Sequence, residues 1–211
     1  AAPLQYIEFS PYLYVPKTIL EEDKLPQIKA DPGYLERHHF EIVSWNKTKI
    51  IDQQTIDWSL VDADTFPGLL RQKPGPWNAL GQIKFMLPNQ HAIYLHDTND
   101  RSVFDQRDRL LSSGCIRLRN PVDLAAYLLA DQGWDEKRIR TAMAAQQPQR
   151  LDLQHPIPVH ILYWTAWVDD NGRVNFREDV YERDQDLLRA FEQASPGCRL
   201  DIPTSVTSEL P

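Results

Sequence analysis

Residues 96–117 hold the side chains in this sequence that are best suited to covalent chemistry. Cys115 is one of only two cysteines and stands in the segment SSGCIR, and His96 closes the apolar run that leads towards it. A thiol becomes a strong nucleophile at neutral pH when an imidazole accepts its proton or stabilises the thiolate. Small residues before a cysteine leave room for a substrate and for backbone N–H groups that bind an oxyanion. The pattern favours a cysteine nucleophile engaged in acyl transfer.

Two neighbours of the cysteine support this interpretation. Arg117 stands two residues after Cys115, where a guanidinium can lower the pKa of a thiol or bind a substrate carboxylate. Gly114 leaves room around a backbone N–H that can hold an oxyanion. A buried structural cysteine remains the alternative, because lone cysteines are often core residues. The small polar residues Ser112 and Ser113 are not typical of a core strand, and this favours the nucleophile.

His96 is the candidate base because it ends a predicted strand. Alternation over residues 91–96 predicts two faces, one with Ala92, Tyr94 and His96 and the other with His91, Ile93 and Leu95. His96 would then face the polar turn 97–100, and strand ends that open into loops commonly carry site residues. A solvated turn histidine is the alternative.

The group that orients His96 stays open among Ser112, Ser113 and a backbone carbonyl. The nearby acidic residues are predicted to be solvated turn residues; they are Asp97, Asp100 and Asp105. Other chemistries lack their signatures. No histidine pair has metal-ligand spacing with a cysteine or carboxylate, no carboxylate pair is placed for glycoside cleavage, and no glycine-rich phosphate loop exists.

Composition limits the class of protein. The chain has 211 residues, a net charge of −7 and a pI near 5.3, which suits one domain with an insertion and offers no basic field for nucleic acid. No apolar stretch is long enough to span a bilayer. The start at Ala1 is expected to mean a processed chain or an excised domain. Cys115 and Cys198 are both expected to be thiols, because pairing them would abolish the nucleophile.

The first half of the chain is predicted to combine strands with a long loop-and-helix segment. Aromatic and β-branched residues over 4–14 predict a strand with a break at Pro11. Prolines and glycines over 67–76 predict a long irregular connection at the end of this segment. The loop-and-helix segment as a whole is either a lid over the active site or plain surface structure. Residues 83–87 and 91–96 predict a hairpin.

The second half is predicted to hold helices and another hairpin. Asn120 is expected to cap a helix that ends at Gly133. Its buried stripe is predicted to contain Leu124, Tyr127, Leu128 and Leu129. Further elements are a helix at 135–147, an apolar strand at 156–168, a hairpin turn at 169–172 and a helix at 184–194.

Trp164 and Trp167 lie three residues apart within the predicted strand, so they are expected on opposite faces. The favoured interpretation is two core aromatics. The alternative is that one of them lines a groove, with Tyr163 on its side.

Several segments together resemble the L,D-transpeptidase (YkuD-type) catalytic domain of bacteria, and in particular its large YcbB-type branch. They are YLHDT at 94–98, SSGCIR at 112–117, DPGYL at 31–35, WNALG at 77–81 and YWTAWV at 163–168. The resemblance covers nearly the whole chain. Two positions depart from the general family pattern: Ser113 stands where a histidine is usual, and Asp97 where a glycine is frequent. Both departures are usual in the YcbB-type branch, but the first removes the second histidine.

The resemblance implies an α+β fold, mainly β with helices, built on a β-sandwich-like mixed sheet. It implies a catalytic domain at 1–195, within which 12–75 form an inserted helical and loop capping subdomain, and a loose tail at 196–211. Members of the family often carry a separate peptidoglycan-binding module and a membrane anchor or signal. These are expected to lie outside this sequence.

The resemblance also implies an activity: formation of 3→3 peptidoglycan cross-links through a Cys115 thioester, with release of D-alanine from a tetrapeptide donor stem. It implies His96 as the base, Gly114 and Ser113 as further catalytic positions, and substrate contacts by Arg117, Tyr94 and Trp164. No metal or cofactor is expected. The implied partners are donor and acceptor stem peptides and, as covalent inhibitors, carbapenem-type β-lactams; the implied location is the periplasm. An L,D-carboxypeptidase and a non-catalytic peptidoglycan-binding module are the alternatives.

Overall fold

The computed structural model describes residues 2–91, 93–110, 112 and 114–194. It divides into two compact units, Ala1–His160 and Ile161–Pro211, and each is described by itself. The first unit contains two sheets and the candidate nucleophile and base, and the second contains a hairpin and a helix.

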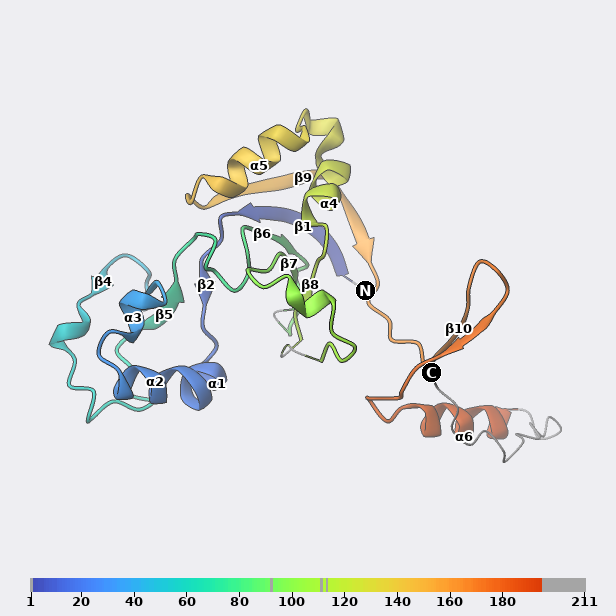
Figure 1. Cartoon of the computed structure of the whole chain (residues 1–211), viewed down its shortest axis with the longest axis horizontal. Coiled ribbons are helices and arrows are strands. Elements are labelled where there is room, and N and C mark those ends of the chain that lie inside the picture. Colours follow the sequence, from blue (N-terminus) through green and yellow to red (C-terminus); the bar gives the residue numbers. More distant parts are fainter. Residues whose placement is uncertain (1, 92, 111, 113, 195–211) are drawn as a thin grey trace. The chain divides into compact units, whose positions relative to one another are not determined.

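A five-stranded sheet forms the centre of the first unit (Figure 1). Its strands, in spatial order, are β8 (Ile116–Arg117), β7 (Leu95–His96), β6 (Ile83–Met86), β1 (Ala2–Phe9) and β9 (Gln149–Val159). All neighbours are antiparallel except β7 and β8, which are parallel. The prediction of an α+β fold with a mixed sheet is therefore confirmed.

Helices α4 (Pro121–Leu129) and α5 (Glu136–Ala144) cover one face of this sheet (Figure 1). The fully buried side chains between them include Leu4, Ile7, Phe9, Ile83, Phe85, Leu129 and Ile139. A β-bulge in β1 between Leu4 and Tyr6 explains how Leu4 and Ile7, three residues apart, both face this core. The helices thus close one face and leave the other for chemistry.

The opposite face of the sheet carries a row of polar side chains. Residues directly across from each other in neighbouring strands point to the same face, and the register aligns Arg150, Glu8, Lys84, His96 and Arg117 across all five strands. Each of these residues alternates with the apolar residues of the core. The candidate base therefore lies in a charged row rather than in the apolar layer.

A four-stranded sheet lies within the segment between β1 and β6. Its strands are β2 (Leu13–Tyr14), β5 (Leu69–Gln72), β3 (Phe40–Val43) and β4 (Ile50–Ile51), in that order. Short helices accompany it: α1 (Lys17–Ile19), a π-helical turn (Leu20–Lys24), α2 (Leu25–Ala30) and α3 (Tyr34–Arg37). This segment has its own core, which includes Leu35, Phe40, Ile42, Phe66 and Leu70.

The prediction of an irregular connection over 67–76 was wrong at β5, which pairs along its whole length with β3. The prolines and glycines flank this short strand and do not interrupt it. Gly68 is required by close packing, because a Cβ there would lie 2.1 Å from the carbonyl oxygen of Val43.

The hairpin of β6 and β7 is confirmed, but β7 is shorter than the predicted strand 91–96. Lys84 pairs with His96 and Phe85 with Leu95. Nearer the turn, the side chain of Asn89 replaces the backbone hydrogen bonds between the two strands. Its amide donates to the Ile93 carbonyl at 2.7 Å and accepts from the Ile93 N–H at 3.2 Å.

The apolar strand predicted at 156–168 was also wrong in its bounds. β9 begins earlier and ends at Val159, because it pairs with β1 from Gln149 opposite Phe9 to Val159 opposite Ala2. The apolar run continues past Val159, where the pairing with β1 ends.

Two details of α4 differ from the prediction. Tyr127 is 74 % exposed, and the buried positions after the first residue of the helix are Val122, Ala125 and Leu129. Their spacing of three and four residues defines the helix face, and Tyr127 lies away from it. The side chain of Asn120 makes no capping hydrogen bond, whereas α5 is capped by Asp135, whose carboxylate accepts from the Arg138 N–H at 2.7 Å.

The second unit contains the hairpin β10 (Ala166–Val168) and β11 (Val174–Phe176) and the helix α6 (Asp184–Ala194). The predicted turn at 169–172 and the predicted helix are confirmed. The interpretation of Trp164 as a core aromatic was wrong, because 61 % of it is exposed and it precedes the strand. Trp167 is half-buried, with the Arg177 guanidinium 4.4 Å from its ring centroid.

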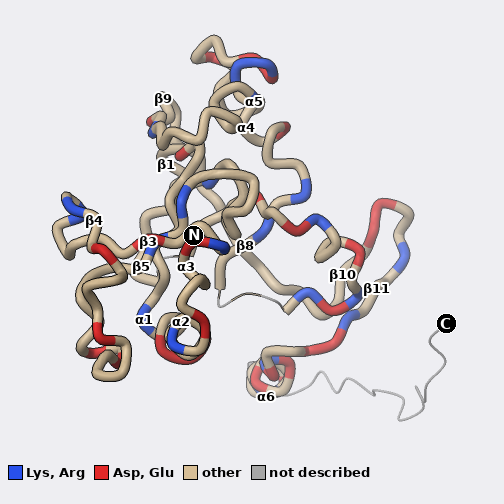
Figure 2. Tube along the Cα trace, turned by 60° about the vertical axis from the view of Figure 1, so that its left-hand side comes forward, with Lys and Arg blue, Asp and Glu red and all other residues tan. Residues whose placement is uncertain are grey.

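Charge and hydropathy are distributed as in an ordinary globular chain. Acidic and basic residues intersperse along the described trace (Figure 2). Among the described residues, none of the helices has the length and apolar character that a bilayer crossing requires.

Candidate active site

The parallel pairing of β7 with β8 brings the candidate nucleophile beside the candidate base. Leu95 lies opposite Ile116 and His96 opposite Arg117. The Ile116 N–H donates to the Tyr94 carbonyl at 3.0 Å, and the Leu118 N–H donates to the His96 carbonyl at 2.8 Å. One residue earlier in the same register, Cys115 stands opposite Tyr94. Cys115, Tyr94 and His96 therefore share the polar face of the sheet.

Tyr94 contacts both of these groups. Its hydroxyl is hydrogen bonded to Cys115, and its ring forms an edge-type pair with the His96 imidazole, with centroids 5.9 Å apart and an interplanar angle of 65°. Burial, followed by the Cys115 thiol, raises the pKa of Tyr94 above its ordinary value of 10.0. The phenol thus stays protonated at neutral pH and can donate a hydrogen bond to sulfur.

His96 is buried, and a backbone carbonyl orients it. Its Nδ1 is hydrogen bonded to the carbonyl of Asp97, and because a carbonyl oxygen can only accept, Nδ1 carries the proton. Burial lowers the pKa of His96 below its ordinary 6.5, although the backbone carbonyls of Asp97 and Leu80 act in the opposite direction. Of the three orienting groups considered from the sequence, this contact corresponds to the backbone carbonyl.

Asp97 is buried, so the prediction of a solvated turn residue was wrong. Only 4 % of it is exposed. One carboxylate oxygen, Oδ2, accepts from the Gln82 N–H at 3.0 Å, and the other, Oδ1, accepts from Arg101 at 2.7 Å. Gly81 makes room for this carboxylate, because a Cβ at that position would lie 2.4 Å from the Asp97 side chain. These contacts fix the peptide whose carbonyl holds His96.

The loop before Cys115 is held by Ser112. Its hydroxyl donates to the Cys115 carbonyl at 2.6 Å and accepts from the Gly114 N–H at 3.2 Å. Gly114 has φ of +135°, a backbone conformation that L side chains rarely adopt. Ser113, predicted as a catalytic position, lies outside the described residues, as does Cys198.

Arg117 is half-buried, and its charge is one of the causes that lower the pKa of His96. It therefore belongs to the same cluster as the base. Trp164 belongs to the second unit, where it is exposed. Asp100 and Asp105 are exposed, as predicted.

The sequence did not indicate three residues that surround Cys115 and His96. They are Asp97, which is buried, and Glu8 and Lys84, which lie in the charged row. Arg101 four residues after Asp97 was a signal for the first, since that spacing allows an ion pair. Glu8 and Lys84 become neighbours of the site only through strand register.

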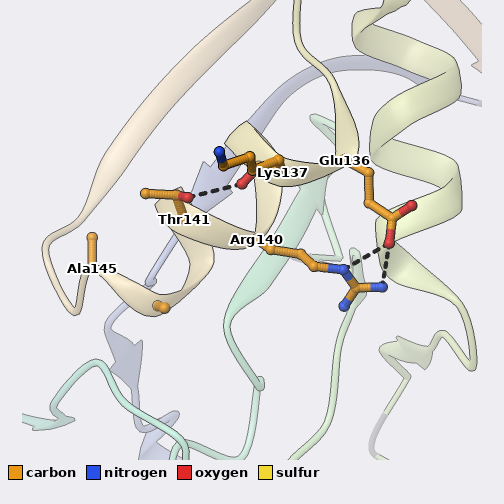
Figure 3. A pocket seen from close by; sticks show the side chains of 6 residues that line it. Glu136, Lys137, Arg140, Thr141 and Ala145 are labelled. Atoms are coloured by element: carbon orange, nitrogen blue, oxygen red, sulfur yellow. Dashed lines mark hydrogen bonds and ion pairs between the residues drawn. The ribbon is translucent and has the colours of Figure 1, made fainter.

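Other parts of the structure do not join this cluster. His39 stacks on Trp77 with ring centroids 3.7 Å apart. Figure 3 shows a hollow on α5, where Arg140 bonds Glu136 at 2.7 Å and the Thr141 hydroxyl bonds the Lys137 carbonyl at 2.8 Å; none of the candidate site residues lines it. Within the described part of the chain, no group of three or more His, Cys, Asp or Glu residues could hold a metal ion.

Comparison with known proteins decides the family. The sequence model of the L,D-transpeptidase catalytic domain, YkuD, matches residues 2–157, which span the whole five-stranded sheet except its last residues, together with Cys115 and His96. The chain belongs to the L,D-transpeptidase (YkuD) catalytic-domain family. The resemblance to this family and the predicted enzyme class, an L,D-transpeptidase, are thereby confirmed.

A relative from Haemophilus influenzae, named "Putative L,D-transpeptidase", is 37 % identical over 184 residues. The alignment covers 87 % of this chain but only 37 % of the relative. The L,D-transpeptidase domain described here therefore corresponds to little more than a third of that protein.

Proposed function

We propose that this chain forms 3→3 cross-links in peptidoglycan through a thioester on Cys115, with release of D-alanine from a tetrapeptide donor stem. The observation that carries the proposal is the shared polar face of β7 and β8, where Cys115, Tyr94 and His96 meet. Family membership supports a peptidoglycan substrate, and the periplasm is where such a substrate is found.

Acylation begins with the neutral imidazole. Nε2 of His96 takes the proton of Cys115, and the thiolate attacks the carbonyl of the third stem residue, meso-diaminopimelate in the variant we favour. Backbone N–H groups of Gly114 and Cys115 hold the oxyanion, the first after exchanging its weak 3.2 Å bond to Ser112. The C–N bond to D-alanine breaks, and the leaving amine takes the proton from His96.

Deacylation repeats these steps in reverse with another amine. The side-chain amine of a neighbouring stem attacks the thioester, His96 takes its proton, and the sulfur leaves as the amide forms. Arg117 would bind a substrate carboxylate or position the Cys115 loop. Tyr94 would contact the stem peptides. Ser113 stays a predicted catalytic position, and Trp164 stays a predicted substrate contact. No step requires a metal or cofactor.

Water is the competing acceptor, and the segment 12–75 provides a way to exclude it. We propose that this segment, with its own sheet and core, caps the substrate within a catalytic domain that spans 1–195. A capped thioester would meet the acceptor amine more often than water. If water were the acceptor instead, the enzyme would be an L,D-carboxypeptidase.

Two measurements test the proposal. Purified protein is exposed to a carbapenem, and its intact mass is compared with that of Cys115→Ala and Cys198→Ser variants. An adduct that disappears with Cys115→Ala and persists with Cys198→Ser supports Cys115 as the nucleophile. An adduct retained by Cys115→Ala, or none in the unmodified protein, contradicts it.

Product analysis then separates the acceptors. Incubation with disaccharide-tetrapeptides should yield dimers that lack one D-alanine. Trimmed monomers alone would indicate carboxypeptidase activity, and unchanged substrate would indicate a binding module.

A further inference from the structure

An ion pair lies on the polar face of the sheet, next to the strand that carries the base. The Lys84 ammonium lies 2.8 Å from the Glu8 carboxylate, and only 13 % and 29 % of the two side chains are exposed. Lys84 is directly opposite His96 in the register of β6 and β7, and Glu8 is directly opposite Lys84. Burying an ion pair costs desolvation free energy, and only close contact between the two charges and further favourable contacts offset that cost.

The pair contacts the site through an aromatic ring. The Lys84 ammonium lies 5.2 Å from the centroid of the Tyr94 ring, within the range of a cation–π interaction. The same ring and the His96 imidazole form an edge-type pair, and the Tyr94 hydroxyl is hydrogen bonded to Cys115. The contacts therefore run in sequence from Glu8 through Lys84 and Tyr94 to the sulfur.

We propose that the Glu8–Lys84 pair is a positioning element that holds the Tyr94 ring so that its hydroxyl donates a hydrogen bond to the sulfur of Cys115. This inference rests on the proposed role of Cys115 as nucleophile. Lys84 and Glu8 reach the thiol through the Tyr94 ring. They act through Tyr94, which thereby becomes part of the nucleophile's environment in addition to a substrate contact.

The hydrogen bond from the Tyr94 hydroxyl affects the reactivity of the Cys115 sulfur. A hydroxyl that donates to sulfur stabilises the charged form and so favours the reactive thiolate. The charged or titratable groups that face this cluster come from four strands: Glu8 from β1, Lys84 from β6, His96 from β7 and Arg117 from β8. Glu8 offsets the Lys84 charge, so the pair can fix the ring without adding a net charge to the site.

The structure offers a matched control in the same row. The Arg150 guanidinium lies 3.7 Å from the centroid of the Tyr6 ring, and Arg150 is directly opposite Glu8 on its other side. Tyr6 belongs to β1, which is separated from β7 by β6. Arg150→Met therefore removes a comparable cation–π contact and one positive charge at a distance from Cys115.

The test measures the rate of Cys115 alkylation by iodoacetamide as a function of pH, with the modified residue assigned by peptide mass. Tyr94→Phe should lower the alkylation rate at pH 7 by roughly tenfold, the effect of losing one hydrogen bond to a charged group. Lys84→Met should lower it by about threefold, since the ring remains but is less fixed. Lys84→Arg should restore the original profile, and Arg150→Met should leave it unchanged.

A double-variant cycle separates positioning from a direct charge effect. In a Tyr94→Phe background, Lys84→Met should produce no further loss of alkylation rate. An equal loss in both backgrounds overturns the inference, because Lys84 would then act on the thiolate through space. If Lys84→Met does not fold, the Glu8→Gln/Lys84→Met double variant, which removes both charges, replaces it under the same expectations.

The two proposals fail in different ways. If Cys115 of the unmodified protein reacts no faster than free cysteine at neutral pH, the proposed nucleophile is wrong. If it reacts rapidly and Lys84→Met leaves its profile unchanged, only the positioning role is wrong.

Discussion

Replacement of Asp97 by asparagine should destabilise the protein although it changes a single atom. The two carboxylate oxygens accept from two different donors, the Gln82 N–H at 3.0 Å and Arg101 at 2.7 Å. An asparagine side chain has only one acceptor oxygen, and its NH₂ group would face the second donor. Asp97→Asn therefore leaves one buried donor without its acceptor.

The size of the effect follows from that lost bond. A hydrogen bond to a charged group contributes about 1.5–3 kcal/mol, and an unmet buried donor costs a similar amount. We expect the free energy of unfolding to fall by about 2 kcal/mol. For a protein of this length, such a loss lowers Tm by roughly 4–8 °C.

Asp105→Asn is the matched control, because it makes the same change of charge in an exposed ion pair. Asp105 lies 3.4 Å from Arg119, and 81 % and 59 % of the two side chains are exposed. Exposed pairs contribute about 0–1 kcal/mol, so this variant should unfold close to the unmodified protein. Urea unfolding followed by tryptophan fluorescence measures both variants, and hydrogen exchange of the Gln82 amide reports the lost contact directly.

Equal stability of the two variants would refute the reasoning. So would a destabilised Asp97→Asn protein whose Gln82 amide exchanges no faster than before, because the loss would then arise elsewhere.

Two further outcomes are expected. The pKa of His96 is lower in the folded protein, so the unfolded chain binds the proton at higher pH than the folded chain. The free energy of unfolding should therefore decrease as pH drops through 6.5. His96→Gln should make this decrease smaller. For the same reason the acid limb of kcat/KM should lie below pH 6.5, and a limb above 6.5 would contradict the assigned burial effect. In α4, Leu129→Ala should cost about 2–5 kcal/mol of unfolding free energy, whereas Tyr127→Ala, at a 74 % exposed position, should change it by less than about 0.5 kcal/mol.

The sequence indicates Cys115 and His96 as candidate nucleophile and base because both stand in short local patterns. The hairpin leading to His96 and the small residues before Cys115 are readable within ten residues of each side chain. The parallel pairing that joins them was not readable, because β7 and β8 contain only two residues each. Their alignment depends on the whole sheet.

The sequence-based predictions were wrong where the burial or the strand bounds of a residue depend on a partner far away in the sequence. Asp97 is buried because its side chain packs against Gly81 and accepts a hydrogen bond from the Gln82 N–H. These two residues are about 15 positions away in the sequence, so no local pattern predicts the contact. β5 exists because β3 pairs with it, although prolines and glycines surround it. β9 takes its bounds from β1, while the apolar run at 156–168 continues past Val159.

The junction between the two sheets has a consequence for how this enzyme can vary. The Ser10 N–H donates to the Gln82 carbonyl at 2.8 Å, and Phe9 pairs with Ile83, so the chain leaves the catalytic sheet and returns to it at adjacent positions. The free-energy cost of closing such an excursion rises by only about 0.6 kcal/mol for each doubling of its length. Evolution or an engineer can therefore lengthen, shorten or exchange most of the excursion while the strand register stays intact. The exception is its last turn, where Leu80 and Gly81 meet His96 and Asp97.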